Sequence, residues 1–416
     1  MTSSYPHAVR RASLASALAV SVLLTAVSTL PGLVARSSAS GPGDPVAFGL
    51  PTPTGPERPG TLELHLVDRQ RTDPWAEDGG PRELMISIWY PAVHEPGAPA
   101  TPYLPERVAS FYDQTSAELG IARGAVDFAG AVSSAQTRAP VAGTTPRPVV
   151  LYSPGGGMSR ALGTILVEEL VSHGYVVVTV DSTYQAPVEL PSGLTLPARG
   201  VDLEQALAER VRDLRFVLDQ LELLVAGGNP DQQRRPLPTG LRTVLDLDRV
   251  GVFGHSMGGF AAAEAMQADP RLDAGVNLDG SMGQEYQADP DGRIDRPFLL
   301  VGAGTDGDSG RPHTHRDAPD WADYWARMTG WRRDLHLPDG EHMSFTDLQH
   351  VLPAVGREVD LDEEAVRAAI GTVDPEQSLT VQRTYLRAFF DHHLRDEPQP
   401  VLDAVPASLP VAELVP

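Results

Sequence analysis

The chain has 416 residues, of which 41% are hydrophobic and 21% charged, a composition typical of globular proteins and unlike that of a collagen, a coiled coil or a disordered tail. Its formal charge of −22 argues against binding to nucleic acid or to anionic membranes, whose negative groups would repel it. Because the sequence contains no cysteine, disulfides, thiolate catalysis and zinc–thiolate or iron–sulfur sites are excluded.

Residues 1–40 have the pattern of a secretory signal peptide. Arg10 and Arg11 precede an apolar run from Ala12 to Leu33, and small residues follow it. The run is about long enough to span a bilayer, so a retained anchor is the alternative, but serines, threonines and a proline dilute it. We expect a secreted protein whose mature form has no integral membrane span and begins with a Pro/Gly-rich linker at 41–58.

The next segments predict strands at the start of a globular domain, which we place at residues 59–398. The runs Thr61–Val67 and Leu84–Tyr90 alternate apolar and polar side chains, as expected of an antiparallel strand pair at a sheet edge. Residues 97–145 are polar and rich in proline, and they hold a helical pattern at Glu106–Leu119. We interpret this stretch as a cap insertion that overhangs the active site.

After residue 145, short apolar runs alternate with helical patterns. Strands are predicted at Pro148–Tyr152, Tyr175–Val180, Arg249–Phe253, Ala274–Leu278, Pro297–Val301 and Arg333–Leu337. Helices are predicted at Ala161–Ser172, Leu203–Leu221, Phe260–Gln267, Asp320–Met328 and Val381–Leu394. Such an alternation indicates an α/β fold with a mostly parallel central sheet and helices on both faces. Residues 399–416 are expected to form a C-terminal tail.

A nucleophile motif lies at the junction of a strand and a helix. The segment Gly254-His255-Ser256-Met257-Gly258-Gly259 matches G-x-S-x-G, follows a predicted strand directly and opens a predicted helix. This strand–turn–helix is the nucleophile elbow of α/β-hydrolases, in which a strained turn projects the serine hydroxyl above the sheet. The helix N-terminus at that point favours a developing oxyanion. Ser256 is therefore the predicted nucleophile.

A serine nucleophile needs a general base, and His342 is the best-placed histidine. It follows the predicted strand Arg333–Leu337, on the late loop where this fold carries its base. His313 lies too early in the chain, beside a loop rich in glycine and aspartate. His255 lies inside the elbow itself and is expected to point away from the serine and pack against the sheet.

The acid that orients the imidazole has two candidates. Asp279 ends the predicted strand that follows the elbow, and Asp306 comes directly after the next predicted strand. Both satisfy the chain order of serine, acid and histidine that this fold uses. Spacing along the chain therefore leaves the choice between them open.

Two backbone N–H groups are expected to bind the oxyanion that forms during acyl transfer. One belongs to Met257, the residue after the serine. The other comes from Gly156, with Gly155 in reserve, in the glycine-rich loop after the strand that ends at Tyr152. Glycine in this loop lets the backbone approach a substrate closely. This chemistry needs no metal and no other cofactor.

Together these motifs resemble the plasma-type (isoform II) platelet-activating factor acetylhydrolase family and its bacterial relatives, within the α/β-hydrolase superfamily. The resemblance covers Leu62 to Leu394 and is carried by the glycine-rich loop, the elbow, Leu278-Asp279-Gly280 and the H-x-x-F-x-D pattern of His342–Asp347. It implies a serine ester hydrolase that releases short or oxidised acyl groups from phospholipids without calcium, and it favours Asp279 as the acid.

Three other functions are weighed against this one. A lipase or cutinase-like polyester hydrolase shares the elbow and would use Asp306 as its acid. A serine peptidase on the same fold ranks low, because such peptidases commonly carry an additional propeller-type domain. A catalytically inactive binding module is disfavoured by the intact Ser256, Asp279 and His342. The expected partner is a small-molecule or lipid ester, and the sequence leaves the oligomeric state open.

Overall fold

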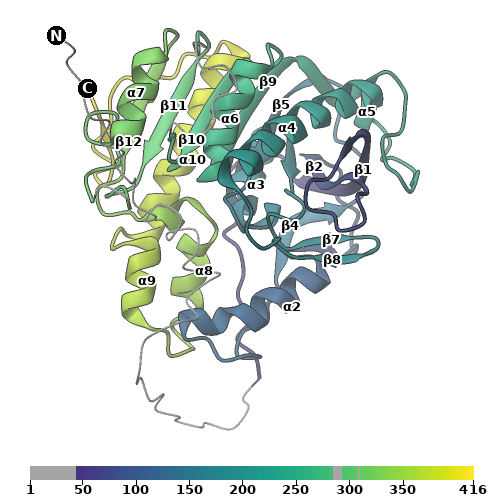
Figure 1. The fold of residues 1–416 in the computed structure, drawn as a ribbon, viewed down its shortest axis with the longest axis horizontal. Helices are drawn as coiled ribbons and strands as arrows, with labels where there is room; N and C mark the ends of the chain where they lie inside the picture. Colours follow the sequence, from purple (N-terminus) through teal and green to yellow (C-terminus); the bar gives the residue numbers. More distant parts are fainter. Residues whose placement is uncertain (1–43, 284–292, 308–309) are drawn as a thin grey trace, which may run out of the picture.

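The computed structural model describes residues 44–283, 293–307 and 310–416 (Figure 1). The predicted signal peptide lies outside these ranges. Within them, no helix is both long enough and apolar enough to cross a membrane.

A large central sheet contains eleven of the described strands. In sheet order these are β13 (Glu413–Leu414), β12 (Arg332–His336), β11 (Phe298–Gly302), β10 (Ala274–Leu278), β9 (Leu245–His255), β5 (Arg147–Ser153), β6 (Val176–Val180), β2 (Pro81–Pro91), β1 (Pro59–Thr72), β4 (Val132–Thr137) and β3 (Ala100–Pro102). Neighbours from β12 to β6 are parallel, whereas β2 runs antiparallel to both β6 and β1. The mostly parallel sheet and the antiparallel N-terminal pair are therefore confirmed.

Helices cover both faces of this sheet (Figure 1). One face carries α4 (Leu203–Val225), α6 (Met257–Ala268) and α7 (Pro319–Arg327), and the other carries α3 (Thr164–Ser172) and α10 (Pro375–Arg395). Because the central strands are buried on both sides, their sequences are almost continuously apolar. Every residue of β6 and β10 is buried.

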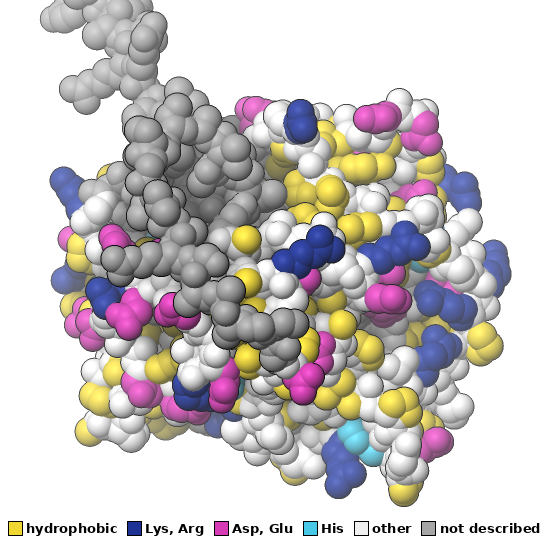
Figure 2. All heavy atoms as spheres, turned by 90° about the horizontal axis from the view of Figure 1, so that it is seen from below, with side chains coloured by type: hydrophobic (Ala, Val, Ile, Leu, Met, Phe, Trp, Pro, Cys, Tyr) yellow, Lys and Arg dark blue, Asp and Glu magenta, His cyan; other side chains and the backbone are white. Residues whose placement is uncertain are grey.

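A further group of short elements lies together along one side of the molecule, at the bottom of Figure 1. It comprises α2 (Glu106–Thr115), the strand pair β7 (Val188–Leu190) and β8 (Gly193–Thr195), α8 (Leu348–Val355) and α9 (Glu363–Ile370). Figure 2 views the molecule from this side. On the described part of this surface, charged side chains of both signs are interspersed with hydrophobic ones.

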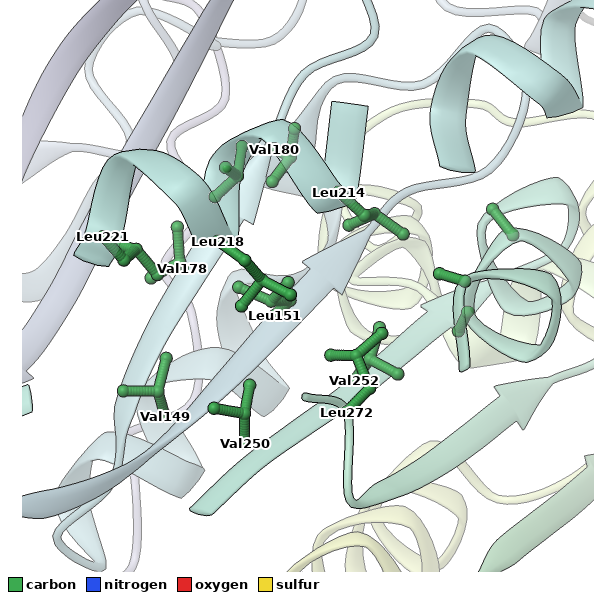
Figure 3. Packing of buried hydrophobic residues seen from close by; sticks show 14 of the residues in the cluster. Val149, Leu151, Val178, Val180, Leu214, Leu218, Leu221, Val250, Val252 and Leu272 are labelled. Atoms are coloured by element: carbon green, nitrogen blue, oxygen red, sulfur yellow. The ribbon is translucent and has the colours of Figure 1, made fainter. Parts of the chain in front are cut away.

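The long helix α4 is fastened to the sheet by a row of leucines. Leu214, Leu218 and Leu221 recur at helical spacing and pack on valines of β5, β6 and β9 (Figure 3). Asp202 caps the helix by accepting a hydrogen bond from the Gln205 N–H at 2.8 Å. Burying each such leucine stabilises the fold by about 1.5–3 kcal/mol, so this row holds α4 rigidly in place.

The predicted edge pair of strands is not at the edge of the sheet. β4 pairs with β1, and β3 pairs with β4, so the segment 97–145 adds strands beyond β1. The rest of that segment includes the predicted helix, which forms as α2 followed by the 3-10 turn η1 (Ser116–Leu119). β3 and β4 are short and polar, and backbone hydrogen bonds hold them in the sheet. Their sequences therefore lack the alternation of apolar and polar residues by which a strand is predicted.

Two segments that we expected outside the domain pack against it. In the predicted linker, Val46 forms a β-bridge with Val126, and the Thr54 N–H donates to the Glu169 carboxylate at 2.9 Å. In the predicted tail, β13 pairs antiparallel with β12. Residues on both sides of the predicted domain, 59–398, therefore contact it. Both segments dock largely through backbone groups and isolated side chains, which a periodicity search does not detect.

Replacing Leu218 with alanine should destabilise the fold strongly, because its side chain is 2% exposed and packed between α4 and the sheet. We expect the free energy of unfolding to fall by about 2–5 kcal/mol. Leu223 lies on the same helix but is 45% exposed, so L223A should change this free energy by less than about 0.5 kcal/mol. Urea unfolding of both variants measures the difference, and equal effects would contradict this orientation of α4.

Candidate active site

Ser256 lies in a tight turn between β9 and α6, where its backbone has a positive φ of 56°. Such a conformation costs a non-glycine residue about 1–3 kcal/mol and persists only where the surroundings impose it. Here the Ser256 N–H donates to the Leu278 carbonyl oxygen at 2.9 Å, and Gly254 lies against the backbone of Gly258. A Cβ atom on either glycine would collide with main-chain atoms, which explains both glycines of the motif.

The structure brings Ser256, His342 and Asp279 into one chain of hydrogen bonds. Ser256 Oγ lies 2.9 Å from His342 Nε2, and His342 Nδ1 donates to Asp279 Oδ2 at 2.6 Å. The histidine opens the 3-10 turn η3 (His342–Phe345), and the aspartate directly follows β10. Asp306 follows β11, and its backbone N–H donates to the Arg311 carbonyl oxygen. It is therefore Asp279 that holds the imidazole, with its Nε2 facing the serine hydroxyl.

A second histidine, His313, completes the surroundings of Asp279. Its buried ring donates from Nδ1 to Asp279 Oδ1 at 2.7 Å and lies against Trp321, with 4.0 Å between ring centroids. The Ala303 N–H donates to the same carboxylate oxygen at 2.7 Å. Burial opposes ionisation of Asp279, but the two histidines outweigh it and hold the pKa of this carboxyl well below its usual range.

His313 is itself shifted toward the charged form. Burial favours the neutral ring, but the adjacent Asp279, with smaller contributions from Asp320 and Asp306, raises the pKa of His313 above its usual value. As expected, His313 is not the base, since it is His342 that faces Ser256; sequence reasoning nevertheless missed its contact with Asp279. The only sequence feature that could have pointed to His313 was its place in the loop after a predicted parallel strand.

His255 is fully buried, and its ring lies against that of His342. Its Nε2 donates to the His342 carbonyl oxygen at 2.9 Å, and the two ring centroids are 4.6 Å apart. Burial, together with the neighbouring His342, lowers the pKa of His255 to about 3, so the ring is neutral at neutral pH. A neutral ring that donates from Nε2 supports the backbone of the base without competing with it for a proton.

The H-x-x-F-x-D pattern fastens η3 to the start of α3. The carboxylate of Asp347 accepts hydrogen bonds from the N–H groups of Thr164 and Ile165, at 3.0 and 3.1 Å, and from the Tyr103 hydroxyl at 2.9 Å. Burial nevertheless raises the pKa of Asp347 to about 7. An acid at a helix N-terminus satisfies backbone donors that would otherwise lack partners. Asp347 thus links the loop of His342 to the helix that follows the glycine-rich loop.

The glycine-rich loop runs alongside Ser256. A Cβ atom on Gly155 would lie only 2.8 Å from Met158 Sδ and 2.9 Å from His255 Nδ1, so a larger residue here would force these side chains to shift. Gly156 and Ser256 line the same cavity. Among the described residues, the N–H groups of Gly156 and Met257 have no hydrogen-bond acceptor. Both are therefore free to donate to a group bound in that cavity.

The cavity beside Ser256 and His342 measures about 100 Å³ and is mostly apolar. Elements far apart in the chain supply its walls, including the predicted linker, α2 and α8. Its aromatic lining consists of Phe48, Tyr103, Phe111, Tyr112 and Phe128. The rings pack edge to face, with 6.2 Å between Phe48 and Tyr103. Within the described ranges, no cluster of three His, Cys, Asp or Glu residues could hold a metal ion.

Comparisons with known proteins give a consistent result. No protein-family model matches the chain. A probable 1-alkyl-2-acetylglycerophosphocholine esterase of Arthroderma benhamiae is 27% identical over 87% of this chain and 92% of its own length. The platelet-activating factor acetylhydrolase of Bos taurus is 26% identical over 37% of this chain and 39% of its own length. A solved ferulic acid esterase from Streptomyces cinnamoneus is 36% identical with a TM-score of 0.73, covering 88% of this chain and 99% of that one. The fold class expected from the sequence is thereby confirmed.

The charge on His313 should make its contribution to stability depend on pH. A histidine whose pKa is raised by folding stabilises the fold fully below its unfolded pKa, and this contribution is lost as the pH rises through the folded pKa. We therefore expect H313N, which keeps an N–H donor but no charge, to destabilise the chain more at pH 5.5 than at pH 9. Urea unfolding of parent and variant at both values measures the change.

A matched control is H350N, because burial lowers the pKa of His350. Its contribution to stability should therefore show the opposite trend with pH. If H313N destabilised the chain equally at pH 5.5 and pH 9, the charged pair of His313 and Asp279 would be contradicted.

Proposed function

Since the chain belongs to the platelet-activating factor acetylhydrolase-like esterases of the α/β-hydrolase superfamily, we propose that it is a secreted enzyme that hydrolyses carboxylic esters through an acyl-serine intermediate. The observation that carries the mechanism is the hydrogen-bonded chain from Ser256 through His342 to Asp279, with spacings of 2.9 and 2.6 Å. Secretion rests on the signal-peptide pattern of residues 1–40.

In the first half of the reaction, Ser256 Oγ attacks the ester carbonyl carbon while His342 Nε2 accepts the hydroxyl proton. Asp279 stabilises the imidazolium that forms, and its own low pKa keeps it ionised throughout. The carbonyl oxygen becomes an oxyanion, to which the N–H groups of Gly156 and Met257 donate. Collapse of this intermediate breaks the bond to the alkoxide, which leaves with the proton from His342.

In the second half, water replaces the alcohol. His342 Nε2 accepts a proton from the water, whose oxygen attacks the acyl carbon of the ester bond to Ser256. The same two N–H groups stabilise the second oxyanion. Collapse releases the carboxylic acid, and His342 returns its proton to Ser256 Oγ, which restores the starting state.

The preferred substrates in this proposal are esters with a compact acyl group, such as short-acyl phospholipids. The cavity of about 100 Å³ is small beside the ~300–1,000 Å³ of typical ligand sites, which suits a short acyl chain. The relatives named as an alkylacetylglycerophosphocholine esterase and a platelet-activating factor acetylhydrolase act on substrates of this kind by name.

A second candidate substrate is an ester of an aromatic acid. The aromatic lining of the cavity favours it, because aromatic rings pair with one another at edges and faces. The solved relative named as a ferulic acid esterase points the same way. A cutinase-like polyester hydrolase, which would use Asp306 as its acid, is less well supported, because His342 donates to Asp279.

Activity should separate the two candidate acids. D279N should lower kcat by about 10³–10⁴-fold, because the amide no longer holds the imidazole in the productive tautomer. D306N, at another buried aspartate, should stay within about threefold of the parent. Hydrolysis of p-nitrophenyl acetate by the two variants makes the comparison. A crippled D306N beside a nearly normal D279N would reverse the assignment.

The function itself is tested by a hydrolysis profile of residues 41–416. The panel holds p-nitrophenyl esters of two to sixteen carbons, a short-acyl phosphatidylcholine, methyl ferulate and an insoluble polyester. We expect short-chain esters and the phospholipid to be cleaved in the presence of a chelator, and S256A to be folded and inactive. Turnover by S256A would refute the serine mechanism. Preference for methyl ferulate or the polyester would assign the aromatic-acid or the cutinase-like substrate instead.

A further inference from the structure

Arg210 on α4 lies directly behind the glycine-rich loop. Its side chain is almost fully buried, and its donors reach the backbone of that loop. Nη1 donates to the Pro154 carbonyl oxygen and Nη2 to the Gly155 carbonyl oxygen at 3.2 Å. Nε donates to Gln185 Oε1 at 2.7 Å. A planar guanidinium is suited to hold two successive carbonyl groups at once.

This guanidinium is charged, yet no carboxylate of the described residues forms an ion pair with it. Burial lowers the pKa of Arg210 to about 10, partly countered by the more distant Asp213, so the group remains a cation at neutral pH. By contrast, the buried Arg82 pairs with Asp73 and Asp213, each at 2.7 Å. A buried cation without a bonded anion is costly, and carbonyl oxygens alone rarely compensate it fully. The positive charge of Arg210 therefore acts mainly on the adjacent glycine-rich loop.

The hydrogen bonds of Arg210 fix the direction of the loop's N–H groups. In a trans peptide unit the carbonyl and the N–H point in opposite directions. Because Arg210 holds the Gly155 carbonyl, the N–H of Gly156 in the same peptide unit must point away from Arg210. Gly156 lines the cavity together with Ser256, and its N–H has no other acceptor among the described residues.

The next residue of the loop is tied to the same network. The Gly157 N–H donates to the Gln185 carbonyl oxygen at 2.9 Å, while the side chain of Gln185 accepts from Arg210 and donates to the Ala206 carbonyl oxygen of α4. The loop is thus anchored at consecutive peptide units to a helix that a row of leucines holds on the sheet (Figure 3).

We propose that Arg210 is the positioning residue of the oxyanion hole: it orients the Gly156 N–H toward the reacting carbonyl and places a permanent positive charge behind it. The inference rests on the proposed serine mechanism and adds a residue that does not touch the substrate. A charge and a dipole that are oriented before the reaction stabilise the oxyanion without reorganisation in the transition state. Their loss should therefore lower kcat and leave KM nearly unchanged.

The test compares R210M and R210K with R82M. R210M removes both the charge and the clamp, and kcat for p-nitrophenyl acetate should fall by about 10²–10³-fold, the usual effect of losing one oxyanion donor. R210K keeps a charge but cannot hold two carbonyls, so a fall of at least about tenfold is expected. R82M also empties a buried arginine site, but the hydrogen bonds of Arg82 go to Asp73, Asp213 and the Thr183 carbonyl oxygen rather than to the loop, so kcat should stay within about threefold.

Binding of ketone inhibitors provides a readout that loss of stability alone would not change. Ser256 Oγ adds to the carbonyl carbon of a trifluoromethyl ketone, and the ketone oxygen becomes an oxyanion. The corresponding methyl ketone resembles only the ground state of the substrate. R210M should weaken binding of the trifluoromethyl ketone by the same factor by which it lowers kcat. Binding of the methyl ketone should stay within about threefold of the parent. A kcat for R210M within threefold of the parent, or equal weakening of both ketones, would overturn the proposal.

Two further variants keep the outcomes separable. If R210M and R210K do not fold, Q185L is the substitute, because it removes one hydrogen bond to Arg210. It should weaken binding of the trifluoromethyl ketone selectively, by a smaller factor than R210M would. Unchanged binding in a folded Q185L would then overturn the proposal. Activity in S256A would show that the serine mechanism itself fails. An inactive S256A beside a normal R210M would reject only the role of Arg210.

Discussion

The site depends on a contact between two stretches of backbone that leaves no room for a side chain. At the start of α6, a Cβ atom on Gly258 would collide with the carbonyl oxygens of Ser153 and Pro154 at the end of β5. The nucleophile turn and the glycine-rich loop therefore touch directly, and β5 and β9 are paired up to this point, Ser153 opposite Gly254. The relative position of the serine and the loop is therefore set by contacts between main-chain atoms.

Around this contact, the buried ionisable groups have defined sets of partners. Asp279 is held by two histidines and a backbone N–H, Asp347 by the N-terminus of α3, and Arg210 by loop carbonyls. Such groups are costly to bury and therefore persist only in fixed hydrogen-bond networks. The proposed reaction creates an oxyanion and an imidazolium, and both would form among charges and dipoles that are already oriented.

The walls of the cavity come from parts of the chain that are individually unremarkable. Phe48 belongs to a stretch rich in proline and glycine, Phe111 to a short helix, and Leu352 to a helix that follows η3. None of these segments could bury its apolar side chains alone, but together they enclose an apolar space over the serine. The proposed catalytic residues thus lie at the ends of the strands. The surrounding segments line the cavity and would select the substrate.

The sequence by itself determined the features that have local causes. Runs of buried valine predicted the parallel strands, helical spacing of leucines predicted α4, and the glycines around Ser256 predicted the turn, because only glycine fits where backbones meet. His342 followed from chain order. Spacing along the chain could not choose between Asp279 and Asp306, since both follow neighbouring parallel strands, and only the family resemblance favoured Asp279.

Only the tertiary structure decided which carboxylate reaches His342. Asp279 adopts a positive φ of 55° that turns its carboxylate toward both histidines, and no local pattern encodes that turn. The same holds for Arg210, one polar residue on an amphipathic helix in the sequence, whose role depends on a loop 55 residues away. Contacts over such separations arise from how buried surfaces pack, and packing leaves no period in the sequence to read.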